Sequence, residues 1–215
     1  MIAGKNIDSA LRIAEFLLQI KAVKLNVREP FTWASGIKSP IYCDNRQILS
    51  YPRIRTYVRQ ELVRSVDDSF GKPDVIAGVA TGGIALGVIV AQELGLPFIY
   101  VRPKPKEHGL SNQIEGNVES GQSVIVIEDL VSSGKSSLGA VEALRDAGCM
   151  VKGMLSIMTY NLPVADENFK NHKCQLVSLT DYDVLIKKAL ETGYINDNDL
   201  DTLERWKSSP KDWNP

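Results

Sequence analysis

The stretch SVIVIEDLVSSGKSSLGAVEALRDAG, from Ser123 to Gly148, reads as a strand, a short turn and a helix in direct succession. The residues of Ser123–Asp129 are mostly apolar and β-branched, as in a strand that is covered on both faces. From Ser136 to Ala147 the apolar residues recur at helical spacing, and Gly148 is a typical helix terminator. The stretch therefore predicts one β–α unit of a parallel sheet, with polar residues placed where the strand meets the helix.

The same alternation continues on both sides of this unit. A helix is predicted over Gly83–Leu94, and the further predicted strands are Asp74–Ala80, Pro97–Val101, Val151–Tyr160 and Gln175–Leu179. Apolar strands separated by helices predict an α/β fold, with a mostly parallel central sheet and helices on both faces. Ligands of such sheets bind at the carboxyl ends of the strands. The loops after Ala80, Val101 and Ile127 are therefore expected to lie together.

The two ends of the chain have a different character. Asp8–Ile20 and Tyr51–Val66 have the periodicity of helices, whereas residues 23–46 combine short β-prone pieces with Pro and Gly. This intervening segment is predicted to form strands and turns. The polar tail, residues 181–215, is predicted to be mostly helical, and its aromatic residues are expected to pack onto the body: Tyr182, Tyr194, Trp206 and Trp213.

Composition excludes several classes of protein. The chain of 215 residues suits a single domain, and its net charge of −1 gives no electrostatic case for a nucleic-acid or membrane partner. No apolar run reaches the length of a membrane span, and the first residues lack the pattern of a signal peptide. Cys43, Cys149 and Cys174 are widely separated and form no CxxC pair. Reduced thiols in a cytoplasmic protein are therefore expected.

The turn after the central strand ends in Gly134-Lys135-Ser136, like the end of a nucleotide-binding P-loop. That motif needs a glycine five positions before Gly134, but the residue there is Asp129. The P-loop interpretation fails, whereas the phosphate chemistry remains, because backbone N–H groups, hydroxyls and a helix N-terminus all favour an anion. A serine-rich helix cap without a ligand is an equally good interpretation of the turn alone.

The acids Glu128 and Asp129 favour a ligand. Two carboxylates at the end of a buried strand repel each other and lose hydration, so they need a compensating partner. A phosphorylated sugar supplies one, because carboxylates accept hydrogen bonds from the 2′- and 3′-hydroxyls while the turn binds the 5′-phosphate. The motif therefore predicts a ribose 5-phosphate site, with Mg²⁺ held through the ligand to neutralise the acids further.

Two other loops are expected beside this site. The segment ATGGIALG, residues 80–87, places Gly82 and Gly83 at the start of a helix, where backbone N–H groups can face an anion. The segment from 101 to 122 is long and polar, which is typical of either a functional loop or a mobile one. Its basic residues are suited to close over a polyphosphate: Arg102, Lys104, Lys106 and His108. The other histidine, His172, is expected at the surface.

Three separated motifs resemble one known family. VIVIEDLVSSGKSS resembles the phosphoribosyl-pyrophosphate (PRPP) motif of type I phosphoribosyltransferases. FTWASGIKSPIYCDNR, residues 31–46, and VRPKPKEHGLSNQIEG, residues 101–116, resemble the N-terminal signature and the catalytic lid of orotate phosphoribosyltransferases. GYINDNDLDTLERW, residues 193–206, is similar to the C-terminus of one branch of that family. The resemblance covers nearly the whole chain.

The resemblance implies a type I phosphoribosyltransferase fold in one domain, residues 1–215. The core is expected at about 51–180, with an N-terminal hood of about 1–45 that the tail, 181–215, completes. The implied reaction transfers ribose 5-phosphate from PRPP to N1 of orotate, which gives orotidine 5′-monophosphate and pyrophosphate. Mg²⁺ is the implied cofactor, held mainly through PRPP without a direct protein ligand. A homodimer is implied, with Arg102, Lys106 and His108 reaching into the neighbouring subunit's site.

The implied site residues match the family motifs by position. Those for catalysis are Lys106, His108 and Asp129. Those for PRPP are Arg102, Lys106, His108, Glu128, Asp129, Leu130, Val131, Ser132, Ser133, Gly134, Lys135, Ser136, Thr81, Gly82 and Gly83. Those for orotate are Ser132, Lys38, Tyr42 and Cys43.

The sequence departs from some family members. Ala34, Gly82 and Pro103 replace lysines, and no arginine near residues 158–161 is placed to bind the orotate carboxylate. Lys38, or backbone amides near Tyr42, are the alternatives for that role. A phosphoribosyltransferase for a purine or for uracil is one competing interpretation. A regulator of this fold that binds nucleic acid is another, and the absence of a basic module disfavours it.

Overall fold

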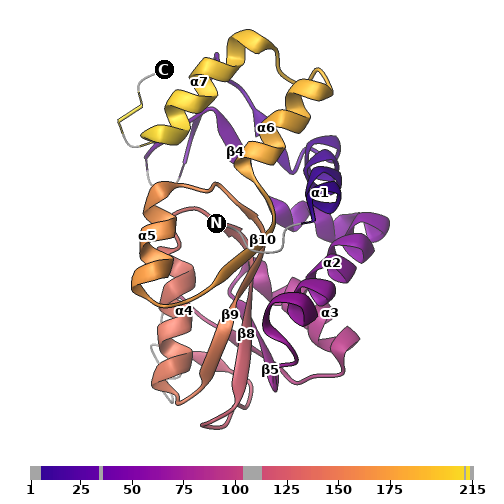
Figure 1. Cartoon of the computed structure of the whole chain (residues 1–215), viewed down its shortest axis with the longest axis vertical. Coiled ribbons are helices and arrows are strands. Elements are labelled where there is room, and N and C mark those ends of the chain that lie inside the picture. Colours follow the sequence, from indigo (N-terminus) through magenta and orange to yellow (C-terminus); the bar gives the residue numbers. More distant parts are fainter. Residues whose placement is uncertain (1–5, 34–35, 104–112, 211, 214–215) are drawn as a thin grey trace.

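A computed structural model of the chain describes residues 6–33, 36–103, 113–210 and 212–213. Its centre is a six-stranded sheet in the order β10-β9-β8-β5-β6-β7 (Figure 1). The strands are β5 (Val75–Val79), β6 (Phe98–Val101), β7 (Ile114–Glu115), β8 (Ser123–Val131), β9 (Met150–Thr159) and β10 (Leu176–Asp181). Neighbouring strands pair in parallel except β7, which runs antiparallel to β6. The prediction of a mostly parallel sheet is confirmed.

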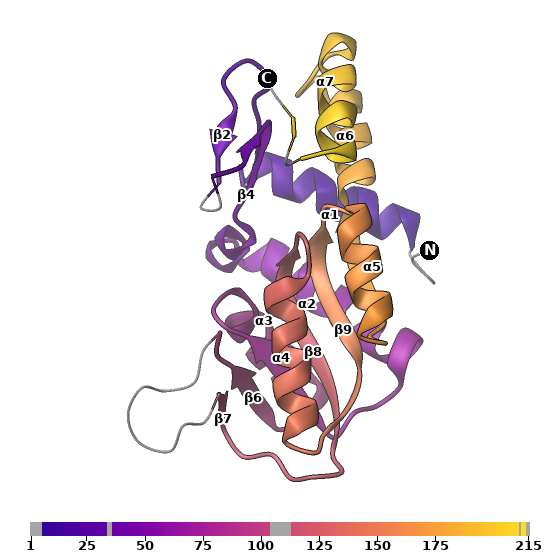
Figure 2. The ribbon, with the colours of Figure 1, turned by 90° about the vertical axis from the view of Figure 1, so that its left-hand side faces the viewer.

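Helices cover both faces of the sheet, as predicted. The helices α4 (Lys135–Asp146) and α5 (Pro163–Asn171) lie on one face, and α2 (Pro52–Phe70) and α3 (Gly82–Leu94) lie on the other (Figure 2). Alternate residues of β8 belong to the two resulting cores. Val124 and Val126 pack in the core that contains α4 and α5, whereas Ile125 and Ile127 pack in the core that contains α2 and α3. The near-continuous apolar sequence of this strand follows from burial on both sides.

Small strands beyond the carboxyl end of the sheet form the hood. The helix α1 (Ile7–Gln19) leads into β1 (Val23–Leu25), which pairs antiparallel with β4 (Ile41–Cys43). Between them, β2 (Phe31–Thr32) pairs antiparallel with β3 (Lys38–Ser39). A 3-10 helix, η1 (Asn45–Ser50), then returns the chain to α2.

The tail forms α6 (Tyr182–Glu191) and α7 (Asp197–Ser208), which lie beside the hood strands (Figure 1). Trp206 of α7 is fully buried, and its indole N–H donates to the Lys38 carbonyl at 3.2 Å. Its ring packs on Trp33 of the hood, Tyr160 of the sheet and Tyr182 of α6. A residue near the C-terminus thus joins the hood to the core.

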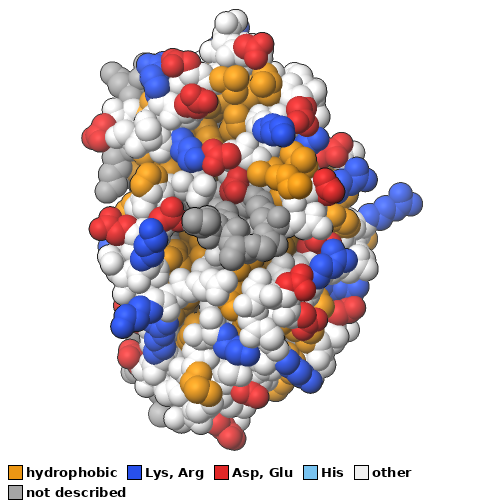
Figure 3. Space-filling model, viewed as in Figure 1, with side chains coloured by type: hydrophobic (Ala, Val, Ile, Leu, Met, Phe, Trp, Pro, Cys, Tyr) orange, Lys and Arg blue, Asp and Glu red, His pale blue; other side chains and the backbone are white. Residues whose placement is uncertain are grey.

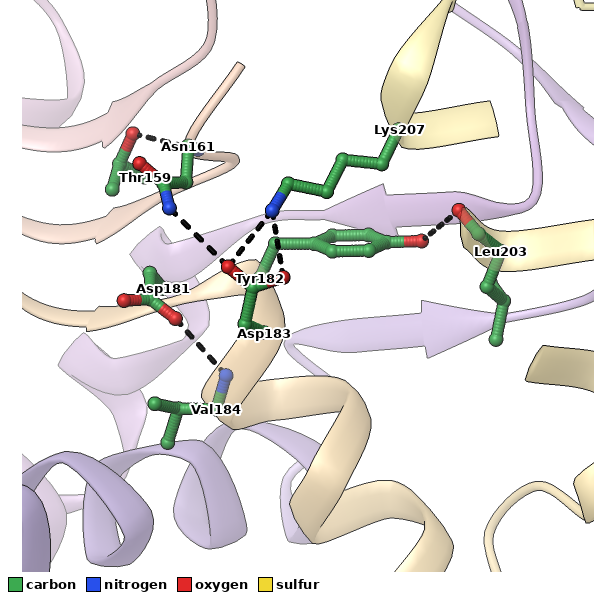
Figure 4. A network of polar contacts seen from close by, with 8 residues as sticks. All are labelled: Thr159, Asn161, Asp181, Tyr182, Asp183, Val184, Leu203 and Lys207. Carbon is green, nitrogen blue, oxygen red and sulfur yellow. Dashed lines mark hydrogen bonds and ion pairs between the residues drawn. The ribbon is translucent and has the colours of Figure 1, made fainter. Parts of the chain in front are cut away.

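A polar network supports the same junction (Figure 4). Lys207 lies 2.7 and 2.8 Å from the two carboxylate oxygens of Asp183, and the Asn161 amide donates to that carboxylate at 3.2 Å. The Tyr182 hydroxyl donates to the Leu203 carbonyl at 3.1 Å. These contacts connect α7 to the start of α6 and to the loop after β9.

Two observations concern the described surface. Among the described residues, no helix has the length and apolar character needed to cross a membrane. Figure 3 shows Lys and Arg interspersed with Asp and Glu over the face that it draws. That face therefore offers no large patch of a single sign.

Replacing Trp206 tests the junction of tail and hood. We expect Trp206→Ala to lower the free energy of unfolding by about 3–5 kcal/mol, because it empties a fully buried aromatic site and leaves the Lys38 carbonyl without its donor. Denaturant unfolding measures the change. Tyr194→Ala is the control, because Tyr194 is 41% exposed and the change should stay near 0.5 kcal/mol. Equal losses in the two variants would contradict the prediction.

Candidate functional site

The central strand is longer than its sequence predicts. β8 continues past Asp129 because Leu130 pairs with Met158 and Val131 pairs with Thr159 of β9. Val131 is fully buried, so the strand ends where its apolar contacts end. The turn is consequently the short segment 132–134, and α4 begins at Lys135, one residue earlier than predicted.

The two acids are neighbours at the end of β8 but differ in burial and in partners. Glu128 is 6% exposed and accepts a hydrogen bond from the Ser137 hydroxyl of α4 at 2.9 Å. Asp129 is half-buried, and its carboxyl group lies where a β-carbon on Gly82, the first residue of α3, would be. The acids therefore have different surroundings, and Asp129 is the more accessible of the two.

Glu128 is an unusual carboxyl group. Burial raises its pKa well above the ordinary value of 4.5, and the negative charge of Asp129 raises it further. Its other oxygen accepts from the backbone N–H of Asp129 at 3.0 Å. A raised pKa favours the protonated form of Glu128, which reduces the repulsion between the two acids.

The turn after β8 has the properties of an anion site. Gly134 adopts a left-handed conformation, φ 76°, and a β-carbon there would lie 2.6 Å from the Phe169 ring. Within the described part of the chain, the backbone N–H groups of Ser132, Ser133 and Gly134 donate no hydrogen bond. Unpaired N–H groups before a helix N-terminus favour a bound anion. Lys135 and Ser136 are exposed on the first turn of α4.

The glycine loop before α3 touches the acid strand directly. A β-carbon on Gly83 would collide with the carbonyl oxygen of Ile127, and one on Gly82 would collide with the Asp129 carboxyl group. Thr81 is exposed at the N-cap of α3. The loop after β5 thus lies directly against the end of β8, at Ile127 and Asp129.

The hood contributes residues at the same end of the sheet. Cys43 is half-buried, and its thiol lies 3.1 Å from the Asn45 amide oxygen and 4.0 Å from the Met158 sulfur. Burial raises the pKa of the Cys43 thiol, and the charge of Asp129 adds to the effect. The Asn45 amide donates to the Asp129 backbone carbonyl at 2.7 Å.

Two further residues predicted to border orotate, Lys38 and Tyr42, lie on the hood strands β3 and β4. Lys38 is exposed, and its ammonium group donates to the Thr32 hydroxyl at 2.8 Å. Tyr42 is 39% exposed and its ring packs against Phe31. Their proximity to a base stays a prediction.

Arg102 lies at the carboxyl end of β6. Its guanidinium is 3.5 Å from the Glu115 carboxylate, and its backbone exchanges two hydrogen bonds of 2.9 Å with Gln113. No sequence pattern predicts the short strand β7 that follows, because its two residues are too few for a β-pattern. Lys104, Lys106 and His108 lie outside the described residues.

Three residues of the site were missed from sequence. Ser137 binds Glu128, Asn45 binds the strand at Asp129, and Asn168 of α5 donates to the Ser133 carbonyl at 2.9 Å.

The helix α5 after β9 could have been expected from the sequence, because parallel neighbours such as β9 and β10 require a crossover. Pro163 at its first turn and the spacing of Ala165 and Phe169 are the local signals.

A cavity of about 340 Å³ lies elsewhere, between α5 and the edge of the sheet. Its lining includes Thr159, Phe169, Lys170, Lys173 and Leu176. Phe169 separates this cavity from the turn at Gly134. Among the described residues, no group of three or more His, Cys, Asp and Glu side chains is arranged to hold a metal ion.

Comparison with known proteins assigns a family to this geometry. The phosphoribosyl transferase domain matches residues 44–177. The orotate phosphoribosyltransferase of Phocaeicola vulgatus is 56% identical over 200 residues, which cover 93% of this chain and 94% of that protein. The one of Porphyromonas gingivalis is 52% identical over 201 residues, with 94% and 96% covered. The crystal structure of the Aeropyrum pernix orotate phosphoribosyltransferase matches with a TM-score of 0.75 at 27% identity, covering 86% of this chain and 99% of that one.

Gly82→Ala tests the contact between the glycine loop and the acid strand. The added methyl group takes the place of the Asp129 carboxyl group, so we expect activity to fall at least tenfold while the protein stays folded. Steady-state assays and thermal unfolding measure the two effects. Gly139→Ala is the control, because its β-carbon meets open space within α4. That variant should keep full activity and gain about 0.5–1 kcal/mol of stability. Full activity of Gly82→Ala would contradict the packing.

Glu128→Gln tests the raised pKa. In the folded state the Glu128 carboxyl group keeps its proton to a higher pH than in the unfolded chain. The free energy of unfolding therefore falls as the pH rises from about 4.5 through the raised pKa of Glu128. The neutral amide removes this loss. We therefore expect Glu128→Gln to unfold at higher denaturant than the unchanged protein at neutral pH, with the difference shrinking below pH 4.5. Denaturant unfolding across pH measures it, and exposed Glu119→Gln should show no such trend. A pH-independent difference would refute the assignment.

Proposed function

This chain belongs to the phosphoribosyl transferase domain family, and from that premise we propose that it transfers ribose 5-phosphate from PRPP to N1 of orotate. The products are orotidine 5′-monophosphate and pyrophosphate, a step of pyrimidine biosynthesis. Relatives named for this activity match over nearly their whole length at 56% and 52% identity. The observation that carries the proposal is the meeting of the Asp129 carboxyl group, the Gly82 loop and the turn at Gly134 at one end of β8.

The geometry suits a ligand with an anion at each end and hydroxyls between. We assign the 5′-phosphate to the N–H groups of the turn 132–134, with Lys135 and Ser136 beside it. The pyrophosphate group is assigned to the loop of Thr81, Gly82 and Gly83. The ribose hydroxyls are assigned to Asp129, with Glu128 as the neighbouring acid.

The reaction needs no protein nucleophile. Positive charge develops at C1′ of the ribose as its bond to pyrophosphate lengthens, and negative charge accumulates on the leaving group. Donors that are already in place for that charge contribute most to catalysis in such sites. We assign this role to Arg102, Lys106 and His108. His108 is further proposed to protonate pyrophosphate, because an unperturbed imidazole titrates near neutral pH.

The donor set fits Mg²⁺ held through the substrate. We assign Asp129 and Glu128 as the acids beside the proposed ligand, and among the described residues they belong to no group of three or more side chains arranged to hold a metal ion. Mg²⁺ prefers few protein carboxylates together with substrate phosphates. When bound, the ion neutralises charge on the pyrophosphate group.

The hood is proposed to select the base. Cys43 of β4 lies close enough to Asp129 for the charge of that carboxylate to raise the pKa of the thiol, so we expect a base joined to the ribose there to meet β4. The proposed contacts of orotate are Tyr42, Cys43, Lys38 and Ser132.

Two further proposals rest on the family resemblance alone. They are a homodimer that shares the lid residues and a cytoplasmic location.

Loss of orotate absorbance on adding PRPP and Mg²⁺ tests the activity, with adenine, guanine and uracil assayed in parallel. In this assay we expect Asp129→Asn to lower kcat/KM roughly ten- to hundredfold, because charge-assisted hydrogen bonds to the ribose are lost. Asp68→Asn, an exposed acid on α2, is the matched control and should behave like the unchanged enzyme. Turnover of another base in place of orotate would overturn the substrate. Unchanged kinetics of Asp129→Asn would overturn the ribose assignment.

A further inference from the structure

We propose that Asn168 of α5 is a positioning residue that orients the phosphate turn, an inference that rests on the proposed assignment of the 5′-phosphate to that turn. The Asn168 side-chain amide donates to the Ser133 carbonyl oxygen at 2.9 Å. Asn168 lies two elements away in sequence, beyond α4 and β9, so this contact is not part of the turn's own geometry.

The direction of one peptide unit explains why the contact matters. The C=O of Ser133 and the N–H of Gly134 belong to the same planar trans peptide, in which these two groups point in opposite directions. Asn168 fixes the carbonyl toward α5, so the Gly134 N–H points away from α5. Without that donor, the carbonyl oxygen is free to rotate toward the anion and repel it.

The side chain next to Asn168 supports the same conformation. The Phe169 ring is 5% exposed and packs directly against the α-carbon of Gly134, in the left-handed conformation at φ 76°. One hydrogen bond and one ring from α5 therefore hold adjacent residues of the turn.

The helix α5 is itself held firmly to α4. At its C-terminal end, Arg145 donates to the His172 carbonyl at 2.6 Å and to the Lys173 carbonyl at 3.2 Å. The His172 ring also lies 3.0 Å from the Glu142 carboxylate. Because α4 begins at the turn, this clamp fixes the distance between Asn168 and its acceptor.

Two fragments of PRPP separate positioning from general loosening. Ribose 5-phosphate probes the turn at Gly134, and pyrophosphate probes the loop at Gly82. We expect Asn168→Ala to weaken the binding of ribose 5-phosphate about three- to tenfold, the worth of one neutral hydrogen bond, and to raise the KM for PRPP equally. Pyrophosphate inhibition, the KM for orotate and kcat should stay within about twofold.

Asn171→Ala is the matched control, because it makes the same change at an exposed position of the same helix. Asn168→Asp keeps the size of the side chain but replaces the donor with an acceptor, so its effect on ribose 5-phosphate should be at least as large. The positioning role is overturned if Asn168→Ala binds ribose 5-phosphate and pyrophosphate equally weakly. It is also overturned if Asn168→Ala binds ribose 5-phosphate as tightly as Asn171→Ala does.

Calorimetry of ribose 5-phosphate on the unchanged protein keeps this inference distinct from the proposed function. Binding without turnover of orotate would refute the proposed reaction and leave the positioning role intact. If the protein turns over orotate but Asn168→Ala binds ribose 5-phosphate like the unchanged protein, the positioning role is refuted and the proposed reaction stands.

Discussion

The presence of two neighbouring acids at the end of β8 is the constraint on which the site depends. Two carboxylates that were both ionised there would repel each other strongly. Glu128 is buried beneath α4, where Ser137 donates to it and burial raises its pKa, whereas Asp129 stays half-buried against Gly82. The raised pKa favours the protonated form of Glu128, and Asp129 is the more accessible carboxyl group. Earlier in the same strand, the residues from Val124 to Ile127 alternate between the two cores.

Contacts from distant parts of the chain converge on this strand end. Asn45 of the hood binds the Asp129 carbonyl, Asn168 of α5 binds the Ser133 carbonyl, and Trp206 of the tail binds the hood at Lys38. The tail therefore reaches the site through the hood, and α5 reaches it from the face of the sheet that α4 covers. Residues that touch no substrate in the proposed mechanism still determine where the carboxyl group and the turn lie.

Sequence patterns predicted the sheet, the helices on both faces and the grouping of loops, because the apolar runs and glycines that specify them are local. The family resemblance added the reaction and the roles of the lid residues. The partners Ser137, Asn45 and Asn168 were missed, because a single polar residue carries no periodic signal and its acceptor is fixed by tertiary packing. The helix α5 was also missed, because it is short and only Ala165 and Phe169 of its residues are buried, which leaves a weak periodic pattern.

The absence of a β-carbon at Gly82 ties that position to Asp129, because the carboxyl group occupies the space where a side chain would begin. Some members of the family that this sequence resembles carry a lysine at the corresponding position. A lineage that passes from glycine to lysine there must also turn the acid into another rotamer, because the new side chain and the carboxyl group cannot occupy the same space.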